Sequence, residues 1–400
     1  MGRVIGYDLT DSTAQISISM QTAEKEEVQS VPVFAGSEKY VMPVAALILP
    51  DGEVRYGEDA YDKKGEGGQL ETGLLSKAAS KDEKYESLLK GFVRKSMMLS
   101  SVMAPMNEVE RVVITLPVPD DKYVEAIEKA TQFLRDEGIS VRITGYPECF
   151  FYYAMNQDAH LTMNKIVLFD YNGSAVRTML LSTRTDMRPH VSMVEERVFD
   201  LPMKDDMGFL GIARTVLDSE IVSAVYLSGE GFEGDWLKDS VTYLLERRRR
   251  VFQGRNLYTK GACYAGIDDR DGNPMLETCR FFDDDKVGTG IGIQTEMDGQ
   301  EVYVPLIDSG INWYEAKGMT EFMLGEDQEI RIRMENFFTK DIRYSVIRAD
   351  AFPKRPDRCT RVRLKVKMTD VSTMHCEAED LGFGEIFASS GEAVEADIYL

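Results

Sequence analysis

The stretch Gly6-Tyr7-Asp8-Leu9-Thr10-Asp11-Ser12 contains an apolar strand, an aspartate at the end of that strand and a turn of small residues. Leu168-Phe169-Asp170-Tyr171-Asn172-Gly173 repeats the same pattern in the middle of the chain. Further on, Val225-Tyr226-Leu227-Ser228-Gly229-Glu230-Gly231 runs from an apolar strand into a turn bracketed by glycines. Two strand–Asp–turn segments in one chain predict a duplicated lobe.

The composition is that of a globular protein with an acidic surface. The chain has 400 residues, of which 43% are hydrophobic and 10% aromatic, so wholesale disorder is not expected. Its net charge of -21 disfavours binding to nucleic acids and anionic membranes, which are themselves negative. The sequence has no apolar run as long as a membrane span, and it begins with a strand pattern instead of a signal peptide. We therefore expect a cytoplasmic protein without nucleic-acid or membrane partners.

The cysteines do not follow the spacing of a metal site or a disulfide framework. Cys149, Cys263, Cys279, Cys359 and Cys376 form an odd set without a paired C-x-x-C motif. We expect reduced and mostly buried thiols, as in a reducing compartment.

Two kinds of pattern divide the chain. Alternating strand and helix patterns over residues 1–270 predict α/β lobes, the first over about 1–160 and the second over about 161–270. From residue 275 to 400 the helical periodicity almost disappears, and short strand patterns follow one another between turns rich in Asp and Gly. This pattern is typical of a β-sandwich, so the predicted fold class is α/β plus all-β.

The order of these segments resembles the two-lobed nucleotide-binding fold of actin, sugar kinases and the seventy-kilodalton heat-shock chaperones. The resemblance to the chaperones extends over nearly the whole chain. Val54-Arg55-Tyr56-Gly57-Glu58-Asp59-Ala60 is similar to their early strand and helix start, and residues 361–368 followed by 373–380 look like the last strands of their sandwich. Residues 380–387 are similar to an uncharacterised bacterial chaperone-like family. The resemblance implies an actin-like ATPase fold with a shortened second lobe, then a sandwich without a helical lid.

The resemblance also implies roles for individual residues. Asp8 and Asp170 would hold Mg²⁺ through water, and Glu148 would position the attacking water as a base. An alternative for Glu148 is a first-turn carboxylate that complements a helix dipole. The nucleotide would contact the residues of the three turns, which are Thr10, Asp11, Ser12, Asn172, Gly173, Ser174, Gly229 and Gly231. Lys77 and Lys81 are the candidates for a compensating cation.

Two of the turns depart from the family pattern. Thr10-Asp11-Ser12 stands where the family has Gly-Thr-Thr, and a carboxylate about 4 Å from a triphosphate would cost about 1–4 kcal/mol. Tyr171-Asn172-Gly173-Ser174 stands where the family has Gly-Gly-Gly-Thr. Side chains on Tyr171 and Asn172 would prevent the backbone from closing on a phosphate. The segment between Asp170 and Gly229 is also too short to hold the subdomain that clamps adenine.

These departures favour a chaperone-like module that binds a protein or peptide partner and has lost efficient ATP turnover, with no required cofactor. One alternative is a divergent ATPase that uses ATP or ADP with Mg²⁺. A second alternative is a scaffold or cytoskeletal subunit, because actin-like lobes polymerise. Fold analogy supports the architecture better than it supports any of these activities.

Overall fold

The computed structural model describes residues 2–23, 25–34, 36–297 and 300–400. The chain forms two compact units, Met1–Phe281 and Phe282–Leu400. The division lies somewhat later than the 270–275 boundary indicated by the sequence, because a short helix and a strand still belong to the first unit. In the residues described, no helix combines the length and apolar character that crossing a bilayer requires.

The first sheet of the first unit has the strand order β3-β2-β1-β8-β9, and β4 also pairs with β2. The three strands β1, β2 and β3 pair antiparallel, whereas β8 and β9 continue from β1 in parallel. The strands are β1 (Arg3–Leu9), β2 (Thr13–Gln21), β3 (Glu26–Ser30), β4 (Val41–Pro43), β8 (Val109–Leu116) and β9 (Ser140–Gly145).

The second sheet has the order β14-β13-β10-β11-β12-β15. Its strands β10, β11 and β12 pair antiparallel, and β13 and β14 continue from β10 in parallel. The order β12-β11-β10-β13-β14 therefore repeats the order of the first sheet, with Asp170 of β10 equivalent to Asp8 of β1. The strands are β10 (Lys165–Tyr171), β11 (Ala175–Arg184), β12 (His190–Asp200), β13 (Val222–Ser228), β14 (Arg250–Gln253) and β15 (Cys279–Phe282).

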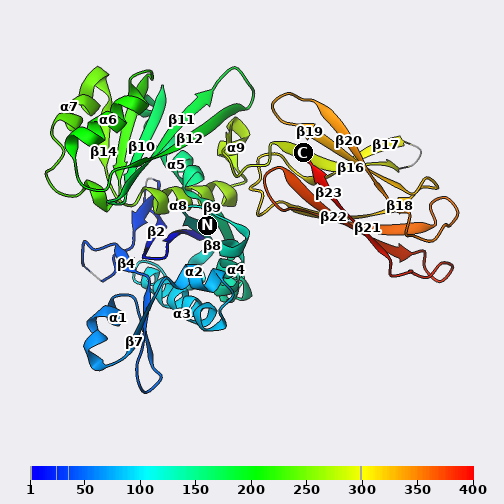
Figure 1. Cartoon of the computed structure of the whole chain (residues 1–400), viewed down its shortest axis with the longest axis horizontal. Helices are drawn as coiled ribbons and strands as arrows, with labels where there is room; N and C mark the ends of the chain where they lie inside the picture. Colours follow the sequence, from blue (N-terminus) through cyan, green and yellow to red (C-terminus); the bar gives the residue numbers. More distant parts are fainter. Residues whose placement is uncertain (1, 24, 35, 298–299) are drawn as a thin grey trace. The chain divides into compact units, whose positions relative to one another are not determined.

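The helices of the first unit are arranged around these two sheets (Figure 1). They are α2 (Leu74–Ala79), α3 (Glu83–Ser100), α4 (Asp121–Asp136), α5 (Tyr146–Met155), α6 (Asp206–Leu217), α7 (Asp239–Leu245), α8 (Leu257–Arg270) and α9 (Pro274–Thr278). Asp120 begins α4 by accepting a hydrogen bond from Tyr123 N at 2.8 Å, as its position before an apolar periodic segment predicts. A small sheet with the order β6-β5-β7 and the short helix α1 extend the first lobe; these are β5 (Ala45–Ile48), β6 (Val54–Tyr56), β7 (Gln69–Thr72) and α1 (Glu58–Asp62).

Helices α5 and α8 pack against each other between the two sheets (Figure 1). Helix α5 shares a hydrophobic core with strands of the second sheet, including Phe150 with Leu168 and Met179, whereas α8 contacts strands β1 and β8 of the first sheet. Close contact requires glycine at Gly261, because a Cβ there would lie 2.0 Å from the carbonyl oxygen of Cys149. Helix α5 follows β9 of the first sheet but packs on the second sheet. Helix α8 follows β14 of the second sheet but packs on the first.

The second unit consists of two antiparallel four-stranded sheets that share one hydrophobic core. Their orders are β17-β16-β19-β20 and β18-β21-β22-β23. Burial alternates along β21 and β22, so one face of each strand points into the core, which is an arrangement of the sandwich type. The strands are β16 (Thr289–Met297), β17 (Gln300–Ile307), β18 (Lys317–Leu324), β19 (Glu329–Asn336), β20 (Ile342–Arg348), β21 (Thr360–Met368), β22 (Thr373–Gly382) and β23 (Ala393–Tyr399).

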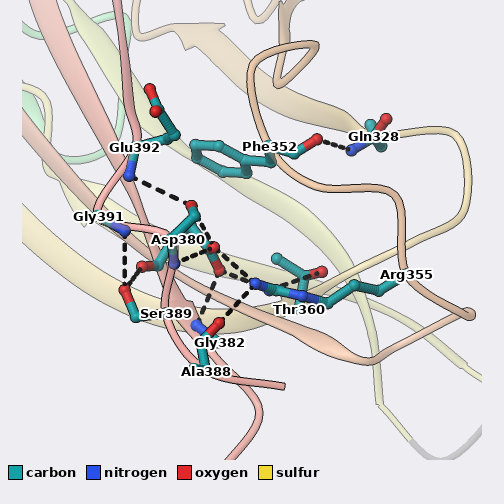
Figure 2. Close-up of polar contacts among 11 residues, drawn as sticks. Gln328, Phe352, Arg355, Thr360, Asp380, Gly382, Ala388, Ser389, Gly391 and Glu392 are labelled. Carbon is teal, nitrogen blue, oxygen red and sulfur yellow. Dashed lines mark hydrogen bonds and ion pairs between the residues drawn. The ribbon is translucent and has the colours of Figure 1, made fainter.

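A buried aspartate organises one end of the second unit (Figure 2). Asp380 is fully buried and accepts two hydrogen bonds from the guanidinium group of Arg355, at 2.7 and 2.9 Å. Ser390 N and Gly382 N donate to the same carboxylate. Arg355 also donates to the carbonyl oxygen of Ala388, so this ion pair ties three segments of the chain together.

Candidate functional site

A cavity of about 400 Å³ lies in the first unit, at the ends of strands β1 and β10. It is lined by Asp8, Thr10, Ser12, Thr13, Gln15, Val41, Pro117, Tyr146, Asp170, Asn172, Ala175, Arg177, Val198, Ser228, Gly229, Glu230, Arg255 and Tyr258. The structure thus gathers six of the site residues named from the sequence, which are Asp8, Thr10, Ser12, Asp170, Asn172 and Gly229. Five others, Asp11, Glu148, Gly173, Ser174 and Gly231, do not line the cavity.

Two aspartate–tyrosine pairs meet in this cavity. The hydroxyl group of Tyr146 donates a hydrogen bond to Asp8 at 2.9 Å, and that of Tyr258 donates to Asp170 at 2.8 Å. The two tyrosine rings stack on each other, with their centroids 3.6 Å apart and their planes inclined by 12°. Because Tyr146 opens α5 and Tyr258 lies at the start of α8, the pairs occupy equivalent positions in the two lobes. The internal repeat therefore extends to the side chains of the site.

The environment of these groups disfavours their ionised forms. Burial raises the pKa of Asp8 to about 7, although the hydrogen bond from Tyr146 opposes the shift, and the nearby carboxylate of Asp170 adds to it. Burial also raises the pKa of Asp170, against the lowering effects of Tyr258 and Arg177. The pKa values of Tyr146 and Tyr258 lie well above their usual value because of burial and the adjacent carboxyl groups. Burial and the neighbouring carboxylate of Asp170 therefore favour the protonated form of Asp8.

Both hairpin turns beside the cavity are closed by their own side chains. Thr10 Oγ1 accepts hydrogen bonds from Ser12 N at 3.2 Å and Thr13 N at 2.9 Å. Asn172 Oδ1 accepts from Ser174 N at 2.9 Å and Ala175 N at 3.0 Å. Thr10 and Asn172 thus have equivalent roles in the two lobes. Each lies two residues after the aspartate of its lobe, and its side-chain oxygen accepts hydrogen bonds from the amide groups two and three residues later. A hairpin turn binds a phosphate through backbone amide groups that have no other partner, and these amide groups already have one.

The structure corrects two expectations about side chains near the phosphate position. Asp11 does not point into the cavity, because its carboxylate accepts a hydrogen bond from Ser76 N at 2.8 Å near the start of α2. Tyr171 does not block the turn either, since its side chain is buried in the core of the second lobe and donates to the carbonyl oxygen of Leu201. The expected repulsion by Asp11 and steric block by Tyr171 were therefore wrong in mechanism.

Glu148 lies outside the cavity. Its carboxylate is buried and pairs with Arg142 at 2.7 Å, while the hydroxyl group of Thr144 donates to it at 2.6 Å. Arg142 also pairs with Asp269 at 3.0 Å, so the group connects β9, α5 and α8. This arrangement is that of a structural ion pair, and it does not fit a base that positions water in the cavity.

The glycine turn after β13 packs closely against β10. Gly229 has φ of 93°, and a Cβ at this position would lie 2.3 Å from the carbonyl oxygen of Tyr171. A Cβ at Gly231 would lie 2.3 Å from the ring of Tyr171. Gly231 is therefore required for packing within the lobe, whereas Gly229 both packs and lines the cavity.

The cations at the cavity are not the lysines named from the sequence. Lys77 donates to Tyr85 and Lys81 pairs with Glu125, and neither lines the cavity. Arg177 and Arg255 line it instead. Arg177 donates to the carbonyl oxygen of Pro117 at 3.0 Å, and Arg255 forms an ion pair with Glu233.

Sequence reasoning missed the two tyrosines and Arg177. The available signal was the repeat itself, because each tyrosine follows the last parallel strand of its lobe at a helix start. Arg177 is paired with Asp170 in the β10–β11 ladder, just as Gln15 is paired with Asp8 in the first lobe. A residue-by-residue alignment of the two lobes would have identified Tyr146, Tyr258 and Arg177 as candidate site residues.

The chain belongs to the family described as "Family of unknown function (DUF5716) C-terminal", whose model matches residues 27–284. Residues 286–400 match the model described as "Domain of unknown function (DUF8552)". No curated protein sequence is significantly similar to the chain. Neither description names the heat-shock chaperones, so the expected likeness to them stays a prediction.

Among solved structures, the chain is similar to a non-polymerising mutant of MamK bound to AMPPNP. The sequence identity is 11% and the TM-score is 0.41. The similarity covers 68% of this chain and 99% of that one.

Proposed function

We propose that the first unit is an actin-like two-lobed domain that does not turn over ATP, and that the chain acts as a chaperone-like module that binds a protein or peptide partner. The observation that carries the proposal is the pair of stacked tyrosines, Tyr146 and Tyr258, bonded to the two aspartates. They occupy the place where the resemblance implies hydrated Mg²⁺ and phosphate.

The repeated topology supports the actin-like architecture. Each lobe has three antiparallel strands followed by two parallel ones, and each carries an aspartate near the end of its first strand. Asp8 and Asp170 line the same cavity, as two equivalent carboxylates of a duplicated nucleotide site would.

The residues in the cavity do not fit a magnesium nucleotide. Mg²⁺ binds carboxylate and water oxygens, but the carboxyl groups of both aspartates already accept hydrogen bonds from tyrosine hydroxyl groups, which a hydrated ion would have to replace. The amide groups of the two turns are bound by Thr10 and Asn172. A triphosphate would have to displace these side-chain bonds before it could reach the amide groups, so we expect nucleotide affinity to be very weak.

Calorimetric titration with Mg-ATP and Mg-ADP tests the expected very weak nucleotide affinity, without which the chain cannot turn over ATP. We expect no binding heat with nucleotide at millimolar concentration. Micromolar affinity in the unmodified chain would overturn this part of the proposal. Titration of the Asn172→Gly variant, which frees the Ser174 and Ala175 amide groups, gives a matched measurement of what the closed turn contributes.

An aggregation assay tests the chaperone-like part. We expect the chain to suppress aggregation of a chemically denatured model protein at near-equal amounts, with no effect of added ATP. An unrelated acidic protein of similar net charge is the control, because charge alone reduces aggregation. Equal suppression by both proteins would count against partner binding.

One observation favours the alternative of a divergent ATPase. The cavity brings together both aspartates, Ser12 and the cation Arg177 in about 400 Å³. If hydrolysis is measured, Glu148→Gln should leave its rate unchanged, because Glu148 lies outside the cavity, whereas Asp8→Asn should abolish it. Loss of hydrolysis in Glu148→Gln with unchanged stability would restore the role assigned from the sequence.

A further inference from the structure

Four consecutive arginines, Arg247 to Arg250, connect helix α7 to the edge strand β14 of the second sheet. Arg249 has a structural role. It is buried, and its guanidinium group donates to the carbonyl oxygens of Leu244 and Tyr243 at the end of α7. Arg249 thus supplies the cation that stabilises the C-terminus of this helix, so this role does not account for the other three arginines.

Arg247, Arg248 and Arg250 are exposed. Arg247 donates to the carbonyl oxygen of Asp218 at 3.4 Å, but within the described part of the chain none of the three forms an ion pair with a carboxylate. The neighbouring Glu246 is exposed and does not pair with them either. These cations remain unpaired in a chain whose acidic residues outnumber its basic ones by 68 to 47, so the surface around them is locally positive.

The backbone at this connection does not explain why arginine occupies it. Arg247 and Arg248 have φ of 53° and 62°, in the left-handed region that residues other than glycine adopt at a cost in free energy. Glycine or asparagine would fit this backbone better. The structure therefore holds two exposed guanidinium groups at positions where the local fold favours other residues, which points to a role in binding.

Strand β14 has one open side. It pairs with β13, and no strand among the described residues pairs with its other side. Arg250 and Phe252 point to the same face, because side chains alternate along a strand. Phe252 is 41% exposed, and its ring stacks on that of Tyr226 with 5.3 Å between the centroids. An added strand would meet free backbone groups together with a cation and, two residues further on, an aromatic ring.

We propose that β14 binds an extended acidic segment of a partner protein. The segment adds to the second sheet as a further strand and places its carboxylates against Arg247, Arg248 and Arg250. Guanidinium groups bind carboxylates through paired hydrogen bonds, and main-chain pairing supplies affinity. The inference rests on the proposed function only in that a protein partner binds, and the aggregation assay can fail while this site still binds its peptide.

The net charge of -21 permits this interaction. Charges more than about 8 Å away are largely screened at physiological ionic strength, so the nearby arginines dominate for a short segment. A nucleic acid carries its charges along its full length, beyond the reach of three arginines, so the net charge disfavours it more strongly.

Titration of the full chain with a short fluorescent peptide, in which alternating valines and threonines lie between glutamates, tests the site. We expect saturable binding that Arg248→Glu combined with Arg250→Glu weakens about tenfold or more. Arg343→Glu is the matched control, because Arg343 is an exposed arginine on edge strand β20 of the second unit. A peptide with lysines in place of the glutamates tests the charge requirement on the unmodified chain. Absence of binding, equal binding of the lysine peptide, or equal weakening by Arg343→Glu would overturn the proposal.

Hydrogen exchange tests the mode of binding. The glutamate peptide should protect residues 250–253, and a peptide with two adjacent central prolines should bind less tightly, because one proline must face β14 and cannot donate a hydrogen bond to it. Equal affinity of the proline peptide would overturn strand addition. Tighter binding of a single-stranded oligonucleotide of equal charge would overturn an acidic protein segment as the occupant.

Discussion

The aspartates of the two units lie in contrasting environments. Asp380 is fully buried, yet the hydrogen bonds from Arg355, Ser390 and Gly382 outweigh the effect of burial and hold its pKa well below the usual range. Asp8 and Asp170 line a cavity and accept bonds from neutral tyrosine hydroxyl groups, and burial raises their pKa values. The guanidinium group beside Asp380 thus favours the ionised carboxylate, whereas burial beside neutral phenols favours the protonated forms of Asp8 and Asp170.

The largest effect is expected for Asp380→Asn. This change leaves the buried guanidinium group of Arg355 without its counter-ion, which should lower the free energy of unfolding of the second unit by about 3–5 kcal/mol. Denaturant unfolding followed by hydrogen exchange of the second unit measures it. Asp397→Asn, at an exposed pair with His375, is the control and should change stability little. A loss below about 1 kcal/mol for Asp380→Asn would remove the contrast.

Glu148 sharpens the contrast within the first unit, because it is a buried carboxylate of the Asp380 type. Glu148→Gln weakens its bond to Arg142 and should lower the free energy of unfolding by about 2 kcal/mol. The matched control is Glu125→Gln on α4, which affects the exposed ion pair between Glu125 and Lys81. Equal effects of the two variants in urea unfolding would show that burial of the Glu148 pair is unimportant.

Removing a tyrosine hydroxyl group should lower the free energy of unfolding by less than removing an ion-pair partner. Tyr146→Phe and Tyr258→Phe keep the stacked rings but leave a carboxyl group without its donor, so each should lower stability by about 1–1.5 kcal/mol. Tyr61→Phe, at an exposed tyrosine of the same unit, is the control for thermal unfolding. Unchanged stability in both site variants would mean that water replaces the hydroxyl groups at no cost.

The smallest expected effect is a pH dependence of opposite sign in the two units. The pKa of Asp8 rises on folding, from 3.8 to about 7, so its contribution to stability is present below pH 3.8 and lost as the pH rises through about 7. The pKa of Asp380 falls on folding, so its contribution is present above pH 3.8 and lost as the pH decreases.

Urea unfolding at pH 5 and pH 8, resolved by unit through hydrogen exchange, measures this difference. The first unit should lose about 1 kcal/mol between these values, because the carboxyl group lines a cavity and is not fully desolvated. Asp8→Asn should remove most of this change. A first unit that is equally stable at both pH values would show that Asp8 is ionised throughout.

The sequence predicted the parts of the site that depend on local pattern. Asp8 and Asp170 lie near the ends of the strands where apolar runs and small-residue turns placed them, and the two lobes repeat one topology. The strand-rich character after residue 275 also follows directly from alternation, which is visible along β21 and β22. Strand β12 was not predicted, because its charged, half-exposed residues lack a strong apolar alternation.

The parts that sequence could not predict depend on where side chains point. Tyr146 and Tyr258 are distant in sequence and meet only because α5 and α8 cross. The carboxylate of Asp11 could face either a phosphate or the start of α2, and only the tertiary position of Ser76 decides this. The role of Glu148 was similarly undecided until Arg142 was placed beside it.

Because α5 and α8 each pack on the sheet of the other lobe, the first sheet lacks its covering helix for part of the synthesis of the chain. The first sheet is complete once residue 145 has been made, but α8, which covers it, is encoded more than a hundred codons later. Until then, the apolar surface of β1 and β8 lacks its cover. We expect the nascent N-terminal half to need a holding factor or slow elongation, and a gene truncated before codon 257 to yield insoluble product.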